Sequence, residues 1–271
     1  QMVLWGYTIP LTRPLQGGQT LRPIVGWSVE QNISKSYLIR VRLLDQAGHI
    51  WAYDEREPQE GNLPTNLWTP GQFVGDQYTL SLPIAMPPGD YQIVIAVFDP
   101  ASNRHLIARD ATGRVLGETI VLETVRIEKN KVSVTASDLQ KQFQLEHPFF
   151  VDMQEIRLIG FKPIPQTIAA GQTLSIGVYW RAREKPRGDY LVSMQLLDTS
   201  GRIALEHRAH PAAGAYPTTE WDAGEVLLDW HELVLPSEMK VGEYSVRVVL
   251  KDIGSGTILG EATLAQISAK P

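Results

Sequence analysis

Apolar and polar residues alternate with a period of two in short runs along the whole chain. In the segment YSVRVVLK (244–251) every second residue is apolar, and the positions between include Arg247 and Lys251. The segments 172–180 and 189–198 alternate in the same way. This period is typical of strands that bury one face. The pattern therefore predicts half-buried antiparallel β-strands.

Turn residues divide the second half of the chain into about seven short strands, and glycine, serine and proline dominate the breaks. The predicted strands lie near 155–162, 172–180, 189–198, 202–208, 229–235, 243–251 and 257–267. Strands of this number and spacing favour an immunoglobulin-like or fibronectin-III-like β-sandwich. A jelly roll is the main alternative.

An unusual octamer occurs twice, and it shows that the sequence repeats. PTNLWTPG (64–71) and PTTEWDAG (217–224) both read Pro-Thr-x-x-Trp-x-x-Gly, 153 residues apart. At the same offset YLIRVRLLD (37–45) matches YLVSMQLLD (190–198), and the register holds without a gap from 17 to 106. A self-match of this length indicates an internal duplication. We therefore expect an all-β protein of two tandem sandwiches that share one fold.

The repeat sets the expected domain boundaries. Residues 1–126 form the first sandwich, 127–150 a linker, and 151–271 the second sandwich, each long enough to bury its own core. The linker carries the sequence SDLQ at 137–140, a capping box that predicts one or two turns of helix. Residues 107–116 have no counterpart in the second copy, and their turn signal predicts an extra hairpin.

A Gly-x-Tyr motif opens the penultimate strand of each copy, at Gly89–Tyr91 and again at Gly242–Tyr244. Sandwiches of the immunoglobulin type place a tyrosine corner at this point, where the hydroxyl bonds an upstream backbone group. We expect Tyr91 and Tyr244 to be equivalent buried corners.

Two interpretations of the repeated octamer remain open. In the structural one, Trp68 and Trp221 plug the end of each sandwich, and Thr65 and Thr218 bond nearby backbone groups. In the other, the two tryptophans are platforms on which sugars stack, helped in the second copy by Tyr216. The structural interpretation is favoured because large aromatic side chains usually serve packing.

Composition excludes several kinds of chemistry. The net charge is −5 and basic residues do not cluster, so no nucleic-acid partner is expected. The absence of cysteine excludes disulfides, thiolate metal sites and a cysteine nucleophile. No apolar run approaches the roughly 18 residues of a membrane span. No protease, hydrolase or nucleotide-binding signature occurs, so no catalytic residue, cofactor or metal site is predicted.

Two polar clusters are weak candidates for metal sites. His207 and His210 stand three apart, which places them on opposite faces of a strand, and further zinc ligands are missing. The acidic run YDEREPQEG (53–61) lacks the spacing of a calcium loop. We expect a solvated strand end at the histidines and a solvated loop at the acids.

The shared string L-x-G-[YF], G-Q-T-L, L-L-D-x-x-G, P-T-x-x-W-x-x-G, L-x-L-P and G-x-Y covers both copies. It resembles the soluble β-rich tails that follow membrane glycosyltransferases of the protein-mannosyltransferase type in some bacteria. In that family the transferase chemistry belongs to the membrane part. The resemblance implies an extracytoplasmic accessory module, and it carries over no catalytic residue because the shared residues suit turns and cores.

Three functions follow from these observations. The first is a non-catalytic structural or interaction module, cut from a membrane-anchored bacterial envelope protein and accessory to a glycosyltransferase. Its partner would be a polysaccharide or the membrane portion of its own parent chain. The second is a carbohydrate-binding module that uses Trp68, Trp221 and Tyr216. The third, ranked last, is an unrecognised hydrolase, which would need a cleft with convergent acids.

Overall fold

The computed structural model describes residues 1–130 and 150–271. The chain divides into two compact units, Gln1–Lys129 and Asn130–Pro271. Each unit is described by itself. The helix expected at 137–140 lies outside the described residues.

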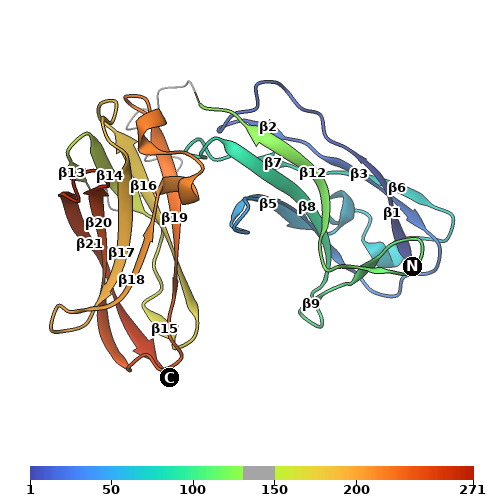
Figure 1. The fold of residues 1–271 in the computed structure, drawn as a ribbon. Helices are drawn as coiled ribbons and strands as arrows, with labels where there is room; N and C mark the ends of the chain where they lie inside the picture. Colours follow the sequence, from blue (N-terminus) through green and yellow to red (C-terminus); the bar gives the residue numbers. More distant parts are fainter. Residues whose placement is uncertain (131–149) are drawn as a thin grey trace. The chain divides into compact units, whose positions relative to one another are not determined.

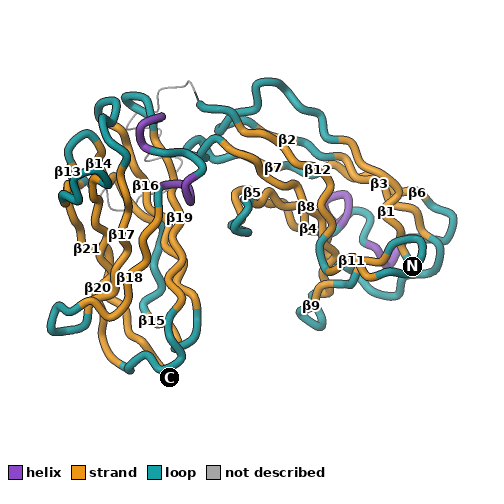
Figure 2. The backbone as a smooth tube through the Cα atoms, viewed as in Figure 1, coloured by secondary structure: helices purple, strands orange, loops and turns teal. Residues whose placement is uncertain are grey.

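Unit 1 consists of β-strands and two short 3-10 helices (Figures 1 and 2). Its elements are β1 (Met2–Thr8), β2 (Thr20–Leu21), β3 (Ile24–Val29), β4 (Leu38–Leu44), β5 (Ile50–Arg56), η1 (Pro58–Gly61), η2 (Thr65–Leu67), β6 (Phe73–Gln77), β7 (Leu80–Ser81), β8 (Gly89–Asp99), β9 (Arg104–His105), β10 (Ala108–Arg109), β11 (Val115–Gly117) and β12 (Ile120–Ile127). One of the two larger sheets has the order β1-β3-β6, and the other has the order β12-β8-β4-β5 with β9 beside β8. Two short sheets pair β2 with β7 and β10 with β11.

Unit 2 is built in the same manner. Its elements are β13 (Val151–Met153), β14 (Ile156–Phe161), β15 (Thr167–Ala169), β16 (Thr173–Ala182), β17 (Tyr190–Leu197), β18 (Ile203–Ala209), η3 (Pro211–Gly214), η4 (Thr218–Glu220), β19 (Val226–Val234), β20 (Gly242–Asp252) and β21 (Ile258–Lys270). The sheets have the orders β13-β14-β16-β19 and β15-β21-β20-β17-β18.

The strand order of the two units agrees. In unit 1 the order β12-β8-β4-β5 stands where unit 2 has β21-β20-β17-β18, and β1-β3-β6 stands where unit 2 has β14-β16-β19. Three antiparallel strands facing four, with this crossover, make the predicted immunoglobulin or fibronectin-III type of β-sandwich. In unit 2 the alternating apolar residues of both sheets form one buried cluster, in which Val178, Met194 and Val248 are fully buried.

The segment present only in the first copy forms the predicted hairpin. Strands β10 and β11 pair with each other in a two-stranded sheet. Asp110 holds the turn, because its Oδ1 accepts hydrogen bonds from the backbone N–H groups of Thr112 and Arg114. A short polar turn residue suits this task.

Both tyrosine corners are present at the predicted positions. The Tyr91 hydroxyl donates to the carbonyl of Pro87, and the Tyr244 hydroxyl donates to the carbonyl of Lys240, each at 2.8 Å. Both rings are buried. Each corner therefore fixes the turn that leads into β8 or β20.

Among the described residues, no helix is both long and apolar enough to cross a membrane.

Candidate functional site

The repeated tryptophans lie in the core of their units. Trp68 is 2% exposed and Trp221 is 1% exposed. The Trp68 Nε1–H donates to the carbonyl of Leu63 at 3.0 Å, and the Trp221 Nε1–H donates to the carbonyl of Tyr216 at 3.1 Å. Each indole thus buries its apolar area and satisfies its one polar group inside its own loop.

Tyr216 supports Trp221 and is itself buried, with 3% exposed. The two rings are stacked with centroids 6.4 Å apart. The Tyr216 hydroxyl lies 2.9 Å from Glu225 Oε1, and burial is the largest cause that raises its pKa. None of Trp68, Trp221 and Tyr216 presents a ring face to solvent. The interpretation of these three as sugar platforms is therefore wrong, because stacking requires an accessible face.

The threonines of the octamer make long-range bonds instead of the local ones expected. The Thr218 hydroxyl accepts from the N–H of Tyr190 at 3.0 Å and donates to the carbonyl of Gly188 at 2.9 Å. The Thr65 hydroxyl makes the same two bonds, to Tyr37 N at 2.9 Å and Lys35 O at 2.8 Å. Both threonines are fully buried. Each joins its loop to the start of β4 or β17.

A buried aspartate anchors the preceding loop in each unit. Asp76 accepts the backbone N–H of Gln59 at 3.0 Å, and Asp229 accepts that of Ala212 at 2.9 Å. The positive φ angles of Gln59 and Ala212, 52° and 53°, aim these N–H groups at the carboxylates. The other partners of the carboxylate differ between the units, and in unit 1 they line a polar pocket.

In unit 2 the second oxygen of Asp229 is closed off by other side chains. Asp229 Oδ2 lies 2.7 Å from His231 Nε2 and 3.2 Å from Trp180 Nε1. His231 is 1% exposed, and its ring centroid is 6.0 Å from that of His207. His210 lies apart from both, with its Nδ1 3.4 Å from Asp189 Oδ2. The structure thus pairs His207 with His231 and not with His210.

Sequence reasoning overlooked His231, since only its apolar neighbours on β19 marked the strand. Among the described residues, no group of three potential ligands could hold a metal ion.

The acidic segment 53–61 is not the solvated loop that was expected. It forms the end of β5 and the helix η1, and three of its four carboxylates have partners. Glu55 pairs with Arg40, Asp54 accepts the backbone N–H of Thr79 at 2.8 Å, and Glu57 accepts the hydroxyl of Ser36. These bonds hold β5 against neighbouring strands, which a charge run alone does not reveal.

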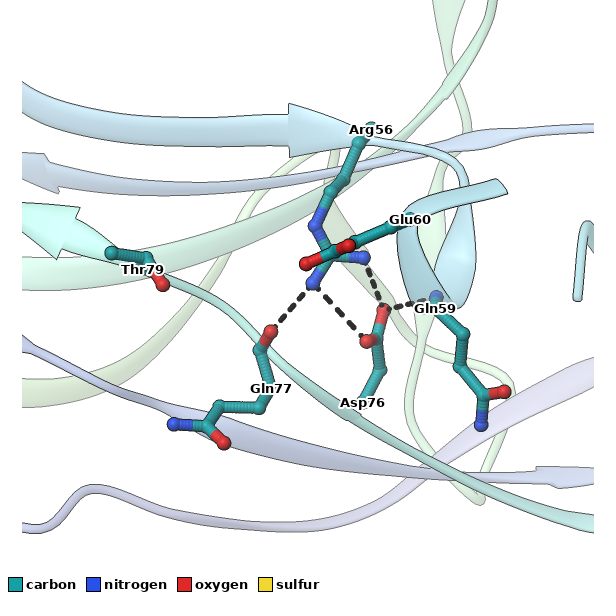
Figure 3. Close-up of a pocket in the computed structure, with 6 residues that line it drawn as sticks. All are labelled: Arg56, Gln59, Glu60, Asp76, Gln77 and Thr79. Atoms are coloured by element: carbon teal, nitrogen blue, oxygen red, sulfur yellow. Dashed lines mark hydrogen bonds and ion pairs between the residues drawn. The ribbon is translucent and has the colours of Figure 1, made fainter. Parts of the chain in front are cut away.

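In unit 1 the second partner of Asp76 is Arg56, and the two side chains form the floor of a polar pocket (Figure 3). Their two nitrogen–oxygen contacts measure 3.0 and 3.1 Å. The pocket has a volume of 380 Å³ and is lined by Arg56, Gln59, Glu60, Asp76, Gln77 and Thr79. The two-point pair neutralises the guanidinium charge, so the pocket offers hydrogen-bonding groups without a free cation.

Two side chains of the polar pocket, Arg56 and Gln59, also cap the free edge of β6. Arg56 Nη2 donates to the carbonyl of Gln77 at 2.5 Å, and Gln59 Nε2 donates to the carbonyl of Gly75 at 3.2 Å. Figure 3 shows Arg56 placed between Asp76 and Gln77. An edge strand whose carbonyls are already bonded is a poor template for another strand.

Next to the polar pocket, the outer face of the β1-β3-β6 sheet carries two exposed aromatic rings. Trp5 is 72% exposed and Phe73 is 67% exposed. Their centroids are 5.7 Å apart in an edge-to-face arrangement. They border a hollow of 470 Å³ that is also lined by Gly26, Trp27, Val74 and Gly75.

The floor of this hollow is bare because glycines pair across it. Gly6 pairs with Gly26, and Gly26 pairs with Gly75, on three adjacent strands. None of the three has a positive φ, and an added Cβ at Gly6 or Gly75 would meet no atom within 4 Å. Gly6 coincides with a bulge in β1, but Gly26 and Gly75 lie in regular pairing. Glycine inside a strand weakens it and often marks a place where a ligand approaches the backbone.

The polar pocket and the aromatic hollow form one continuous surface, which we call the β6 surface. Phe73, Gly75 and Gln77 alternate on β6 and all are exposed. Gly75 lines the hollow, while its carbonyl bonds Gln59 of the pocket. The sequence signal for this surface is the pair of aromatic residues Trp5 and Phe73, whose rings only the fold brings together.

A second polar cluster lies on the sheet that contains β17, β18 and β20 of unit 2. Glu206 accepts hydrogen bonds from Arg208 at 2.6 Å, Ser193 at 2.5 Å and Gln195 at 2.9 Å. These bonds, with that of Arg208 the largest cause, lower the pKa of Glu206 to about 2. Arg247 Nη2 donates to Gln195 at 2.7 Å and extends the network. Ser193 and Gln195 are buried, so the network stabilises this face of the sheet.

Comparison with known proteins finds distant likenesses to solved structures. No family model matches the sequence, and no curated protein matches it. Among solved structures, the C-terminal domain of Wzt is 9% identical over 46% of this chain and 78% of its own length, with a TM-score of 0.35. A CARDB domain from Pyrococcus furiosus, solved with di-metal ions, is 11% identical over 46% of this chain and 90% of its own, with a TM-score of 0.27.

A β-glucosidase from Listeria innocua, solved with glucose, is 14% identical over 43% of this chain, with a TM-score of 0.29. The matched region spans only 16% of the enzyme. What these three proteins bind or catalyse carries no argument for this chain, because the likenesses are too distant.

Proposed function

We propose that this chain is a non-catalytic structural and interaction module, built from one duplicated β-sandwich. It belongs to a membrane-anchored bacterial envelope protein, on the extracytoplasmic side, and is accessory to a glycosyltransferase. The resemblance of its shared motifs to the tails of such enzymes supports the setting.

The observation that carries the proposal is the use the two units make of their shared polar residues. Thr65 and Thr218 make the same pair of backbone bonds, and Asp76 and Asp229 accept the same loop N–H. These groups fix loops and are fully or almost fully buried. The polar residues that both copies share therefore serve the scaffold. The β6 surface, which differs between the units, is the part left to contact a partner.

The proposal is tested on the full gene product that contains this chain. Sugar transfer to an acceptor would be measured in membranes for the full protein, for a variant lacking residues 1–271, and for the isolated chain. We expect transfer to persist at a reduced level in the variant, and no transfer or hydrolysis by the chain alone. Catalysis by the isolated chain would overturn the non-catalytic role. A parent protein with no transferase part would overturn the accessory role.

A further inference from the structure

We propose that the β6 surface of unit 1 binds a neutral, linear oligosaccharide of pyranose rings. This inference deepens the interaction-module proposal and rests on it. It places the sugar on Trp5, Phe73 and the polar pocket, residues distinct from the buried Trp68, Trp221 and Tyr216.

The aromatic end of the surface offers what a pyranose ring stacks on. Trp5 and Phe73 are the side chains of β1 and β6 that stand clear of the sheet, 72% and 67% exposed. Exposing two large rings side by side has a cost in water, and contiguous exposed apolar surface usually marks a binding site. Because the rings meet edge to face, one flat face of the indole stays free of its neighbour.

The polar end offers what the hydroxyl groups of a sugar bond to. Gln59, Gln77 and Thr79 supply amide and hydroxyl groups, and Glu60 supplies a carboxylate acceptor. Gln77 lies four residues from Phe73 on one strand, or roughly 13 Å in an extended chain. That span suits a short chain of rings and is too long for a single monosaccharide.

The charges that line the polar pocket disfavour an anionic ligand. Arg56 is the only cation that lines the polar pocket, and both of its terminal nitrogens are held by Asp76. The guanidinium also contacts the Asp54 carboxylate, the carbonyls of Glu57 and Gln77, and the face of the Tyr78 ring. A phosphate or carboxylate would have to break this pair while facing Glu60, so a neutral hydroxylated ligand is the better match.

The hydrogen bonds of the β6 backbone disfavour pairing with an added peptide strand. The carbonyls of Gly75 and Gln77 on its free edge already accept bonds from Gln59 and Arg56. A flat ligand can instead lie on the face at Gly75, where an added Cβ would meet no atom within 4 Å, beside Gly26, where it would lie 3.8 Å from Trp5 Cε3. In unit 2 the corresponding positions hold Tyr179 and Leu228, both buried, so the site belongs to unit 1 alone.

The test uses the full 271-residue chain and three hexasaccharide probes, cellohexaose, mannohexaose and chitohexaose. Binding is measured by titration calorimetry and by tryptophan fluorescence. We expect at least one probe to bind. Trp5→Ala should weaken that binding about tenfold, and Trp5→Phe should restore most of it, because a phenyl ring keeps a stacking face.

Two further variants locate the sugar. Gly75→Leu adds a side chain in open space, so the fold is kept while the floor is covered, and binding should fall by at least about tenfold. Tyr53→Ala is the matched control, an equally exposed ring (68%) on β5 outside the site, and it should bind like the unaltered chain. The urea midpoint of each variant checks that it is folded.

If the folded chain binds none of the three probes, the choice of saccharide is overturned. Binding that survives both Trp5→Ala and Gly75→Leu would overturn the location. Neither result bears on the module role, which the deletion in the parent protein tests separately.

Discussion

Replacing Thr218 with valine removes one hydroxyl and keeps the shape of the side chain. The loss leaves two backbone groups without partners, the N–H of Tyr190 and the carbonyl of Gly188. Each hydrogen bond contributes about 0.5–1.5 kcal/mol net, and an unsatisfied buried group costs about 1–3 kcal/mol. Because the bond to Tyr190 is buried, we expect Thr218→Val to lower the stability of unit 2 by about 2–4 kcal/mol.

The measurement is urea unfolding followed by pulsed hydrogen exchange and mass spectrometry, which reports the two units separately. With a slope near 2 kcal/mol per molar urea, the midpoint of unit 2 should fall by about 1–2 M. Thr218→Ser keeps the hydroxyl and should lose far less. Thr65→Val is the matched variant in unit 1, and its effect should be smaller because its bond to Tyr37 N is only partly buried.

Two results would refute this reasoning. A midpoint shift below about 0.3 M for Thr218→Val would show that the hydroxyl does not tie the loop to β17. If a substitution in one unit shifted the urea midpoints of both units equally, the bonds would not act within their own unit.

Tyr244→Phe should lower the stability of unit 2 by about 0.5–1.5 kcal/mol, the net value of one hydrogen bond, and an unchanged urea midpoint would count against the corner. Trp221→Ala should cost about 3–5 kcal/mol because it empties a buried site, whereas Trp5→Ala should change the unfolding free energy by less than about 0.5 kcal/mol; equal effects in urea titrations would contradict the difference in burial. The pKa of Glu206 is lowered from 4.5 to about 2, so its bonds stabilise unit 2 above pH 4.5 and this contribution is lost as the pH falls toward 2. Glu206→Gln should therefore flatten the acid limb of the stability profile of unit 2, and an identical profile would contradict the role of its bond to Arg208.

The octamer shows where local pattern stops being informative. Its proline, threonine and glycine correctly indicated a fixed loop, and Gly71 and Gly224 have the positive φ that only glycine adopts readily. The octamer itself does not predict on which side of the loop the tryptophan lies. That side depends on Trp27 and Tyr216, which meet Trp68 and Trp221 in space.

The sequence by itself determined the all-β class, seven strands of the second copy, the hairpin of the first copy and the two tyrosine corners, but not the short strands β13 and β15. These features arise from side-chain alternation and from turn residues, which act over a few neighbouring positions. Only the tertiary structure decided which aromatic rings are accessible and which polar groups meet. Arg56 and Asp76 are twenty residues apart in the chain, and Trp5 and Phe73 are further still, yet each pair lies in contact. Burial and pairing depend on contacts between distant strands, and no short pattern encodes them.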